Sequence, residues 1–116
     1  MIYIFLDDQR EIKEIYQYGL YDPINEHLKN AKDKWIIVRS FEALTNLLVN
    51  VEEDAINNFV ISMDHDLGEE KDGHDCLKWM VENLIIPKEI FFHSGNWTAV
   101  KEMESYWDSY KKSLTI

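Results

Sequence analysis

The sequence is poor in the residues that mark several classes of protein. One cysteine, Cys76, in 116 residues excludes an internal disulfide, and we expect a reducing, cytoplasmic environment. Four glycines and two prolines form no linker, repeat or low-complexity tract. The apolar run 2–6 meets acidic residues too soon for a signal peptide, and no apolar stretch approaches the length of a membrane span. The sequence therefore predicts a soluble intracellular protein.

Basic residues are also scarce. Lys and Arg number 12 against 22 Asp and Glu, which gives a formal net charge of −10 at pH 7. The chain therefore lacks the basic surface that duplex DNA or an anionic membrane requires, and a nucleotide ligand would be held by a few placed cations or a metal ion. Hydrophobic residues, in contrast, make up 46% of the chain and include 4 Trp, 6 Tyr and 5 Phe. These are sufficient for the core of one domain, which we expect to span residues 1–116.

Short apolar runs alternate with amphipathic segments along the chain. The runs are rich in β-branched and aromatic residues, as in strands that are buried on both faces. The segments between them place apolar residues three and four positions apart, which predicts helices that cover a sheet. Ser40 and Asn96 are candidate helix caps. The strands are expected at 2–6, 35–38, 59–63 and 90–92, and the helices at about 22–32, 41–51, 73–84 and 96–114. This alternation predicts an α/β fold, doubly wound around a parallel sheet.

Carboxylates follow two of the predicted strands directly. Asp7 and Asp8 follow the first strand, and Asp64 and Asp66 follow the third. Four carboxylates at adjacent strand ends repel one another unless a cation lies between them, and Mg²⁺ prefers such oxygen ligands. The first and third strands must be neighbours for these acids to share an ion, which predicts the strand order 2-1-3-4. Cys76 falls on an apolar helix face and is expected in the core rather than at the metal.

Several motifs occur in an order and spacing that resemble a known family. They are Leu6-Asp7-Asp8-x-Arg10, Val38-Arg39-Ser40-Phe41, Asp64-His65-Asp66-Leu67-Gly68, Asp72-Gly73 and His93-Ser94-x-Asn96. Over nearly the whole chain they resemble the cyclic-phosphate processing receiver domains, a divergent group of response-regulator receiver domains. The resemblance implies a short flavodoxin-like, receiver-like three-layer sandwich that lacks the usual fifth strand. It also implies metal-dependent processing of cyclic phosphates in nucleotides or at RNA ends.

In ordinary receiver domains the paired acids and the acid after the third strand hold Mg²⁺, and that last acid accepts a phosphoryl group. A lysine after the fifth strand contacts the phosphate, and no position of this sequence matches it. The resemblance therefore favours a role other than aspartyl-phosphate signalling.

These motifs assign the candidate site residues. The expected ligands of Mg²⁺ or Mn²⁺ are Asp7, Asp8, Asp64 and Asp66; the expected phosphate-binding residues are Arg10, Arg39, Ser94 and Asn96; and the expected catalytic residues are His65, His93 and Asp64. We expect His65 to act as the base toward water and His93 as the acid toward the leaving group, or the reverse. Structural roles compete with these assignments: ion pairs for the arginines, a core position for His93 and simple capping for Asn96.

Three functions remain open from the sequence. The first is a divalent-metal-dependent cyclic phosphodiesterase. The second is a sensor or sponge that binds a phosphorylated nucleotide without turning it over. The third is an acidic inhibitor of a protein partner, which would need outward-facing negative charge. The expected ligand is a small phosphorylated molecule, either a cyclic nucleotide or an RNA cyclic-phosphate end, and the protein is expected to be a monomer or a homodimer.

Overall fold

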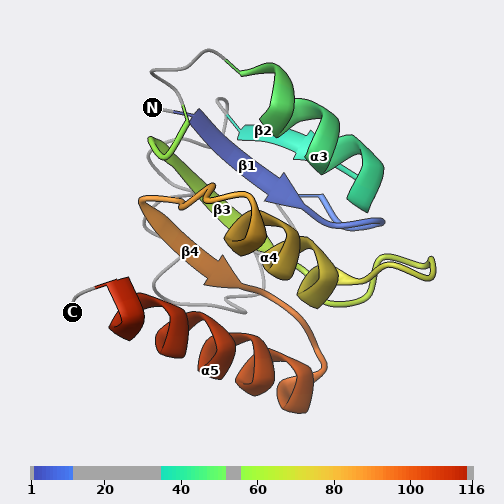
Figure 1. Cartoon of the computed structure of the whole chain (residues 1–116). Coiled ribbons are helices and arrows are strands. Elements are labelled where there is room, and N and C mark those ends of the chain that lie inside the picture. Colours follow the sequence, from blue (N-terminus) through green and yellow to red (C-terminus); the bar gives the residue numbers. More distant parts are fainter. Residues whose placement is uncertain (1, 12–34, 52–55, 115–116) are drawn as a thin grey trace.

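The protein is built on a parallel sheet of four strands. The structure, a computed structural model, describes residues 2–11, 35–51 and 56–114. Within these residues the strands lie in the order β2-β1-β3-β4, which confirms the predicted topology (Figure 1). The strands are β1 (Ile2–Leu6), β2 (Trp35–Val38), β3 (Phe59–Met63) and β4 (Glu89–Phe92). β1 and β3 are the central strands, as their nearly continuous apolar sequences predicted.

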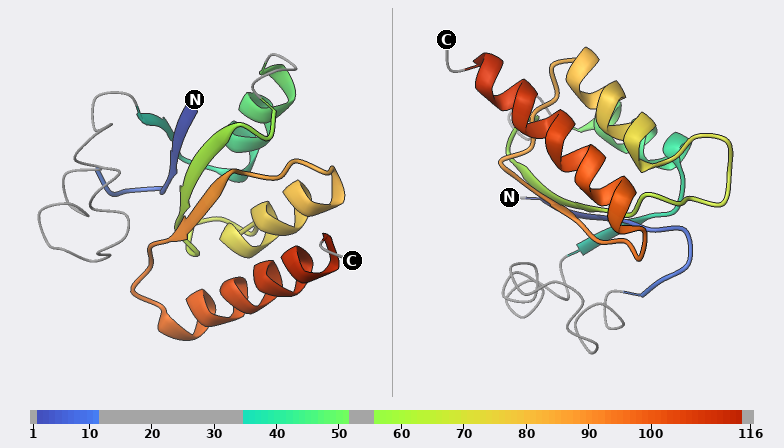
Figure 2. Two further views of the ribbon diagram at one scale, coloured as in Figure 1. Left: turned by 90° about the vertical axis from the view of Figure 1, so that its left-hand side faces the viewer. Right: turned by 90° about the horizontal axis from the view of Figure 1, so that it is seen from below.

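Three helices cover one face of the sheet. They are α3 (Phe41–Asn50), α4 (Gly73–Glu82) and α5 (Trp97–Leu114), and α4 contacts both of its neighbours (Figure 2). The helix expected near residues 22–32 lies outside the described residues. The described residues thus supply two of the three expected layers.

The core lies between this face of the sheet and the helices. Ile4, Leu6 and Met63 from the strands are fully buried there together with Leu77 and other helix residues. Each such side chain stabilises the fold by about 1.5–3 kcal/mol through its removal from water. Cys76 is part of this core, as predicted, and burial raises the pKa of its thiol to about 12. Among the described helices, none combines the length and apolar character needed to cross a membrane.

The helix boundaries follow from local capping. Ser40 Oγ accepts the N–H of Ala43 at 3.0 Å, which confirms the predicted cap of α3. Asp72 and Asp75 form a reciprocal capping box at the start of α4. α4 ends at Glu82, two residues earlier than expected, because the left-handed φ of 58° at Leu84 stops the helix. α3 also ends one residue earlier than expected, and β4 begins one residue earlier.

Candidate functional site

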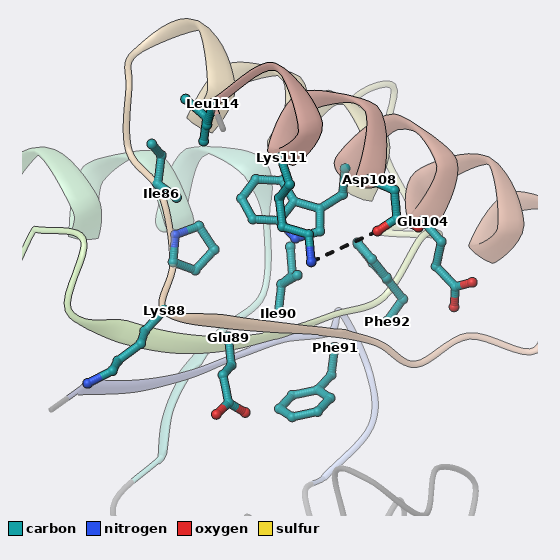
Figure 3. Close-up of a pocket in the computed structure, with 12 residues that line it drawn as sticks. Ile86, Lys88, Glu89, Ile90, Phe91, Phe92, Glu104, Asp108, Lys111 and Leu114 are labelled. Atoms are coloured by element: carbon teal, nitrogen blue, oxygen red, sulfur yellow. Dashed lines mark ion pairs between the residues drawn. The ribbon is translucent and has the colours of Figure 1, made fainter. Parts of the chain in front are cut away.

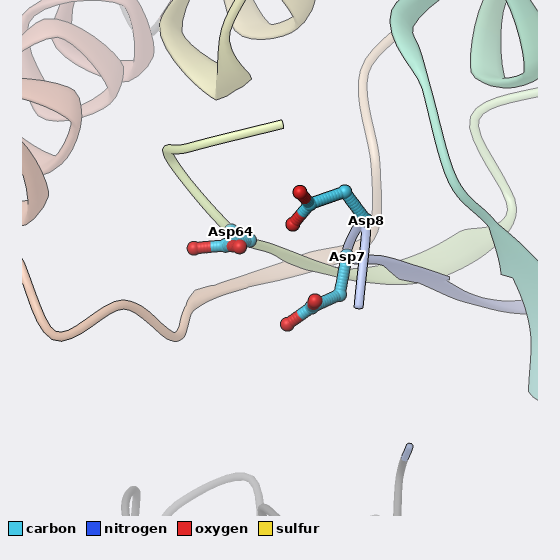
Figure 4. Close-up of side chains that lie close together, drawn as sticks. All are labelled: Asp7, Asp8 and Asp64. Atoms are coloured by element: carbon cyan, nitrogen blue, oxygen red, sulfur yellow. The ribbon is translucent and has the colours of Figure 1, made fainter. Parts of the chain in front are cut away.

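The strand register brings three carboxylates to one point. Leu6 at the end of β1 lies beside Met63 at the end of β3, so the residues that follow them are neighbours. The N–H of Asp64 donates to the carbonyl of Leu6 at 2.9 Å, which extends this pairing past the strands. One carboxylate oxygen each from Asp7, Asp8 and Asp64 lie within 4.8 Å of one another (Figure 4). The described residues hold this one group of three side chains that could bind a metal ion.

These acids form part of the wall of an open hollow of about 540 Å³, here called the acidic hollow. It lies beyond the carboxyl ends of the strands, where ligands bind in open α/β sheets. Its lining residues come from the ends of β1, β3 and β4. They are Asp7, Asp8, Gln9, Arg10, Asp64, Asp66, Gly68, Ser94, Gly95 and Asn96.

The pKa values of the two most buried acids of the hollow are shifted in opposite directions. Burial raises the pKa of Asp64 to about 7, and the charge of Asp7 adds to this effect more than the cation Arg10 offsets it. Burial would also raise the pKa of Asp7, but hydrogen bonds from His93 and from two backbone N–H groups outweigh it and lower the pKa overall. Without a cation, Asp7 is therefore ionised while Asp64 holds its proton until near neutral pH. The repulsion between them is the kind that a bound cation relieves.

Two glycines let the segment after β3 close on these acids. Gly68 has a left-handed φ of 67°, and a Cβ there would lie 2.9 Å from Asp8 Oδ2. A Cβ at Gly73 would lie 2.0 Å from the carbonyl oxygen of Asp64. Only glycine allows either approach without displacing the neighbour. These contacts fix the wall of the acidic hollow against Asp8 and Asp64.

The two predicted phosphate-binding arginines lie in different places. Arg10 lines the acidic hollow, and its Nη1 lies 3.9 Å from Asp7 Oδ2. Arg39 is not among the lining residues. Its Nη1 donates to the carbonyl oxygens of Asp7 at 3.1 Å and of Arg10 at 2.7 Å, and its Nη2 donates to Glu11 at 3.2 Å. Arg39 thus braces the segment that carries the paired acids mainly through backbone carbonyls, and its contact with Glu11 is an ion pair of the kind that competed with phosphate binding.

Ser94 and Asn96 both line the acidic hollow, as expected of phosphate-binding residues. They also shape the turn into α5. Ser94 Oγ accepts the N–H of Asn96 at 3.1 Å, and Asn96 Oδ1 accepts the N–H of Ala99 at 3.1 Å. Capping and lining therefore coexist at this turn, and the predicted cap is confirmed.

The remaining predicted residues are Asp66 and the two histidines. Asp66 lines the hollow but lies outside the group of three converging acids, and its side chain is 76% exposed. His65 lies between two carboxylates, with Nδ1 3.1 Å from Asp66 Oδ1 and Nε2 3.3 Å from Asp72 Oδ2. His93 is buried beneath Asp7, its Nε2 3.0 Å from Asp7 Oδ2. Neither histidine is among the residues that line the acidic hollow.

Sequence reasoning missed two residues that contact His93. Ser62 Oγ hydrogen bonds His93 Nδ1, and the ring of Phe5 stacks on the imidazole with centroids 4.6 Å apart and planes 4° apart. Ser62 carries a signal that could have been used, because it is the single polar residue in the strand Phe59–Met63, all of which is buried. A buried hydroxyl requires a hydrogen-bond partner.

A second hollow, here called the β4–α5 groove, has a similar size but a different lining. It has a volume of about 580 Å³, and Ile90, Phe92 and Trp107 form part of its apolar wall (Figure 3). Its charged residues include Asp108 and Lys111, which lie 4.0 Å apart as an ion pair. No group of converging metal ligands from the described residues lies in this groove.

Comparison with known proteins gives a family match over most of the chain. A family model described as the cyclic-phosphate processing receiver domain matches residues 2–109. Searches of curated proteins and of solved structures gave no match. The family match covers nearly the whole chain and includes all three converging acids, the parallel sheet and α4. The chain therefore belongs to the family of cyclic-phosphate processing receiver domains.

Proposed function

We propose that this protein is a divalent-metal-dependent phosphodiesterase that opens a cyclic phosphate in a nucleotide or at an RNA end. The observation that carries the proposal is the convergence of Asp7, Asp8 and Asp64 within 4.8 Å, in a hollow that also presents Arg10 and Ser94. The description of the family suggests a cyclic phosphate as the substrate, and the side chains of the hollow suit the binding of a phosphate.

The donor set fits Mg²⁺ or Mn²⁺. The three converging atoms are carboxylate oxygens, which are the ligands that hard divalent cations prefer. Burial and the nearby charge of Asp7 raise the pKa of Asp64, and a cation bound between these acids would favour the ionised form of Asp64. Asp7, Asp8 and Asp64 would hold the ion. When bound, it supplies positive charge for the phosphate oxygens and makes water more acidic.

The other side chains of the acidic hollow would bind the phosphate. Arg10 offers a planar guanidinium that can donate two hydrogen bonds to two phosphate oxygens. The Ser94 hydroxyl lies at the turn into α5, an 18-residue helix whose free N–H groups favour an anion. These groups would hold the two nonbridging oxygens and leave the ester oxygens for the reaction.

Ring opening forms a bond from the oxygen of water to phosphorus and breaks one ester bond, so the proton lost by water must reach the leaving oxygen. His65 remains our candidate for this proton transfer, because its side chain is 19% exposed and contacts Asp66, which lines the hollow. His93 is fully buried, and a different role is argued for it below.

The experiment is an activity screen with defined products. The protein would be incubated with Mg²⁺ or Mn²⁺ and with 2′,3′-cyclic nucleotides, 3′,5′-cyclic nucleotides, cyclic dinucleotides or RNA with a cyclic-phosphate end. We expect ³¹P NMR to detect a phosphomonoester from at least one substrate, with loss of turnover in EDTA and in Asp8→Asn. Absence of turnover across the panel would reject the hydrolase.

A second candidate function is a sensor or sponge that binds the same ligand without turnover. The placement of both histidines outside the lining of the acidic hollow favours it, since binding needs no proton transfer. Tight, cation-dependent binding of one substrate of the panel, with no product, would select this function. An acidic inhibitor is disfavoured because Asp7 and Asp64 are buried rather than displayed.

A further inference from the structure

We infer that His93 positions Asp7 as a metal ligand and is itself oriented by Ser62, so that a hydrogen-bonded chain from β3 presets the cation site. This inference rests on the proposed function in one respect, because it takes Asp7, Asp8 and Asp64 to bind a divalent cation. It replaces the expected proton transfer by His93 with a positioning role.

The ring of His93 is fixed from three sides. The backbone N–H of His93 donates to the carbonyl of Met63 at 2.9 Å, which anchors the residue to the end of β3. Phe5 stacks in parallel on the imidazole, and both ring nitrogens have hydrogen-bond partners. The side chain of His93 has no exposed surface. A proton donor to a substrate must reach that substrate, and this ring reaches Asp7 instead.

The partners determine the direction of each hydrogen bond. An ionised Asp7 only accepts, so His93 Nε2 carries the hydrogen that lies between them. When the ring carries its single hydrogen on Nε2, Nδ1 is an acceptor, and the hydroxyl of Ser62 can donate to it. Ser62 is fully buried, so its hydroxyl has no competing bond to water at this position. Donation in this pair of hydrogen bonds then has one direction, from Ser62 to His93 and from His93 to Asp7.

This chain completes the hydrogen bonding of the Asp7 carboxylate. Oδ1 accepts the backbone N–H groups of Gln9 at 2.9 Å and Arg10 at 2.7 Å, and Oδ2 accepts from His93 at 3.0 Å. Both oxygens are thus held, and the carboxylate loses little rotational freedom when a cation binds. Partners that orient a metal ligand in this way typically contribute about 10- to 100-fold to metal affinity.

The test measures Mn²⁺ affinity by electron paramagnetic resonance, with the full chain and without substrate. We expect His93→Leu, which removes the donor, to weaken Mn²⁺ binding about 10- to 100-fold. His93→Gln can place an amide N–H near the position of Nε2, and we expect it to restore most of the affinity. Ser62→Ala leaves the ring in place but frees its orientation, and we expect a smaller loss. Circular dichroism would verify that each variant is folded.

Leu48→Ala provides the control for lost stability. Leu48 is buried in α3 and is not among the residues that line the acidic hollow. We expect this variant to have a lower Tm than the wild type, with unchanged Mn²⁺ affinity. A stability loss alone would then be excluded as the cause of weaker binding in the His93 variants.

The outcomes separate this inference from the proposed function. Wild-type affinity in both His93→Leu and Ser62→Ala would overturn the positioning role and leave the metal site intact. A folded His93→Gln that binds as poorly as His93→Leu would also overturn it, because the ring would then act by packing. If His93→Leu does not fold, wild-type affinity in Ser62→Ala alone overturns it. A wild-type protein that binds no Mn²⁺ would reject both proposals.

Discussion

The acidic hollow and the β4–α5 groove have nearly the same volume, about 540 and 580 Å³, yet they are built in opposite ways. Three carboxyl side chains converge in the acidic hollow, and two of them are buried. In the groove, charges of opposite sign are paired at the edge of an apolar wall. Converging like charges cost stability unless a ligand compensates them, whereas the lining of the groove includes an ion pair, Asp108 with Lys111. The comparison teaches that converging acids, rather than cavity size, distinguish the candidate site from the groove.

The largest effect that we predict is the dependence of protein stability on pH that Asp64 causes. Because burial raises the folded-state pKa from 3.8 to about 7, the unfolded chain releases this proton first as pH rises. The apo protein should therefore lose stability between about pH 4 and pH 7, by as much as about 4 kcal/mol. Asp64→Asn should remove this loss, as measured by urea unfolding at pH 5 and pH 8. Equal pH slopes in the wild type and Asp64→Asn would show that the pKa of Asp64 is not raised in the folded protein.

Asp7 makes stability depend on pH in the opposite direction and in a lower pH range. Its lowered pKa stabilises the folded protein above the unfolded-state value near 4, and this contribution is lost as pH falls below that value. The two acids are thus separable by pH. Asp108→Asn in the β4–α5 groove is the matched control, and its effect should stay within about 0.5 kcal/mol.

The second prediction concerns how closely the wall of the acidic hollow is packed. Gly73→Ala would place a methyl carbon 2.0 Å from the carbonyl oxygen of Asp64, so the backbone must shift. We expect a loss of about 3 kcal/mol in the free energy of unfolding. A Cβ at Gly95 would meet no heavy atom within 4 Å, so Gly95→Ala should be nearly neutral. Chemical denaturation midpoints compare the two, and similar midpoints would contradict the close approach.

The third prediction is that Mg²⁺ stabilises the fold through the acidic hollow alone. An ion that binds only the native state adds about 2.7 kcal/mol when its concentration is 100 times Kd. Asp8→Asn should abolish the resulting rise in Tm, and Asp108→Asn should retain it. Differential scanning calorimetry with and without Mg²⁺ measures both. A full Mg²⁺ response in Asp8→Asn would place the ion elsewhere.

The smallest effect is expected from the brace that Arg39 forms. Arg39→Ala removes donors to the carbonyls of Asp7 and Arg10, and we expect a loss of about 1–2 kcal/mol. Lys111→Ala in the β4–α5 groove breaks an exposed ion pair and should cost less than about 1 kcal/mol. Thermal unfolding of both variants provides the comparison. Equal losses would mean that the contacts of Arg39 contribute no more than a surface charge does.

The sequence was sufficient for the sheet, and the reason is local. Continuous apolar runs followed directly by acids identified the strands, and the need for Asp7 and Asp64 to meet gave the order β2-β1-β3-β4. Caps at Ser40 and Asn96 depend on contacts three residues apart and were predictable in the same way.

The division between lining and supporting residues could not be predicted. The donors of Arg39 contact carbonyls 29 and 32 residues away, and His93 contacts Asp7 across 86 residues. The sequence shows which polar residues follow a strand. It does not show whether their side chains line the acidic hollow or lie beneath its lining. The β4–α5 groove likewise arises only when the sheet and α5 are assembled.

The hydrogen bond from the N–H of Gly73 to the carbonyl of His65, at 2.7 Å, has a consequence for motion. This hydrogen bond closes residues 65–73 into a loop, and the last residue of the loop, Gly73, is the first residue of α4. We expect a loop closed in this way to move together with α4 rather than to open as an independent lid over the acidic hollow. A Cβ at Gly95 would meet no heavy atom within 4 Å, so we expect the turn before α5, rather than residues 65–73, to be the side of the acidic hollow that admits a ligand.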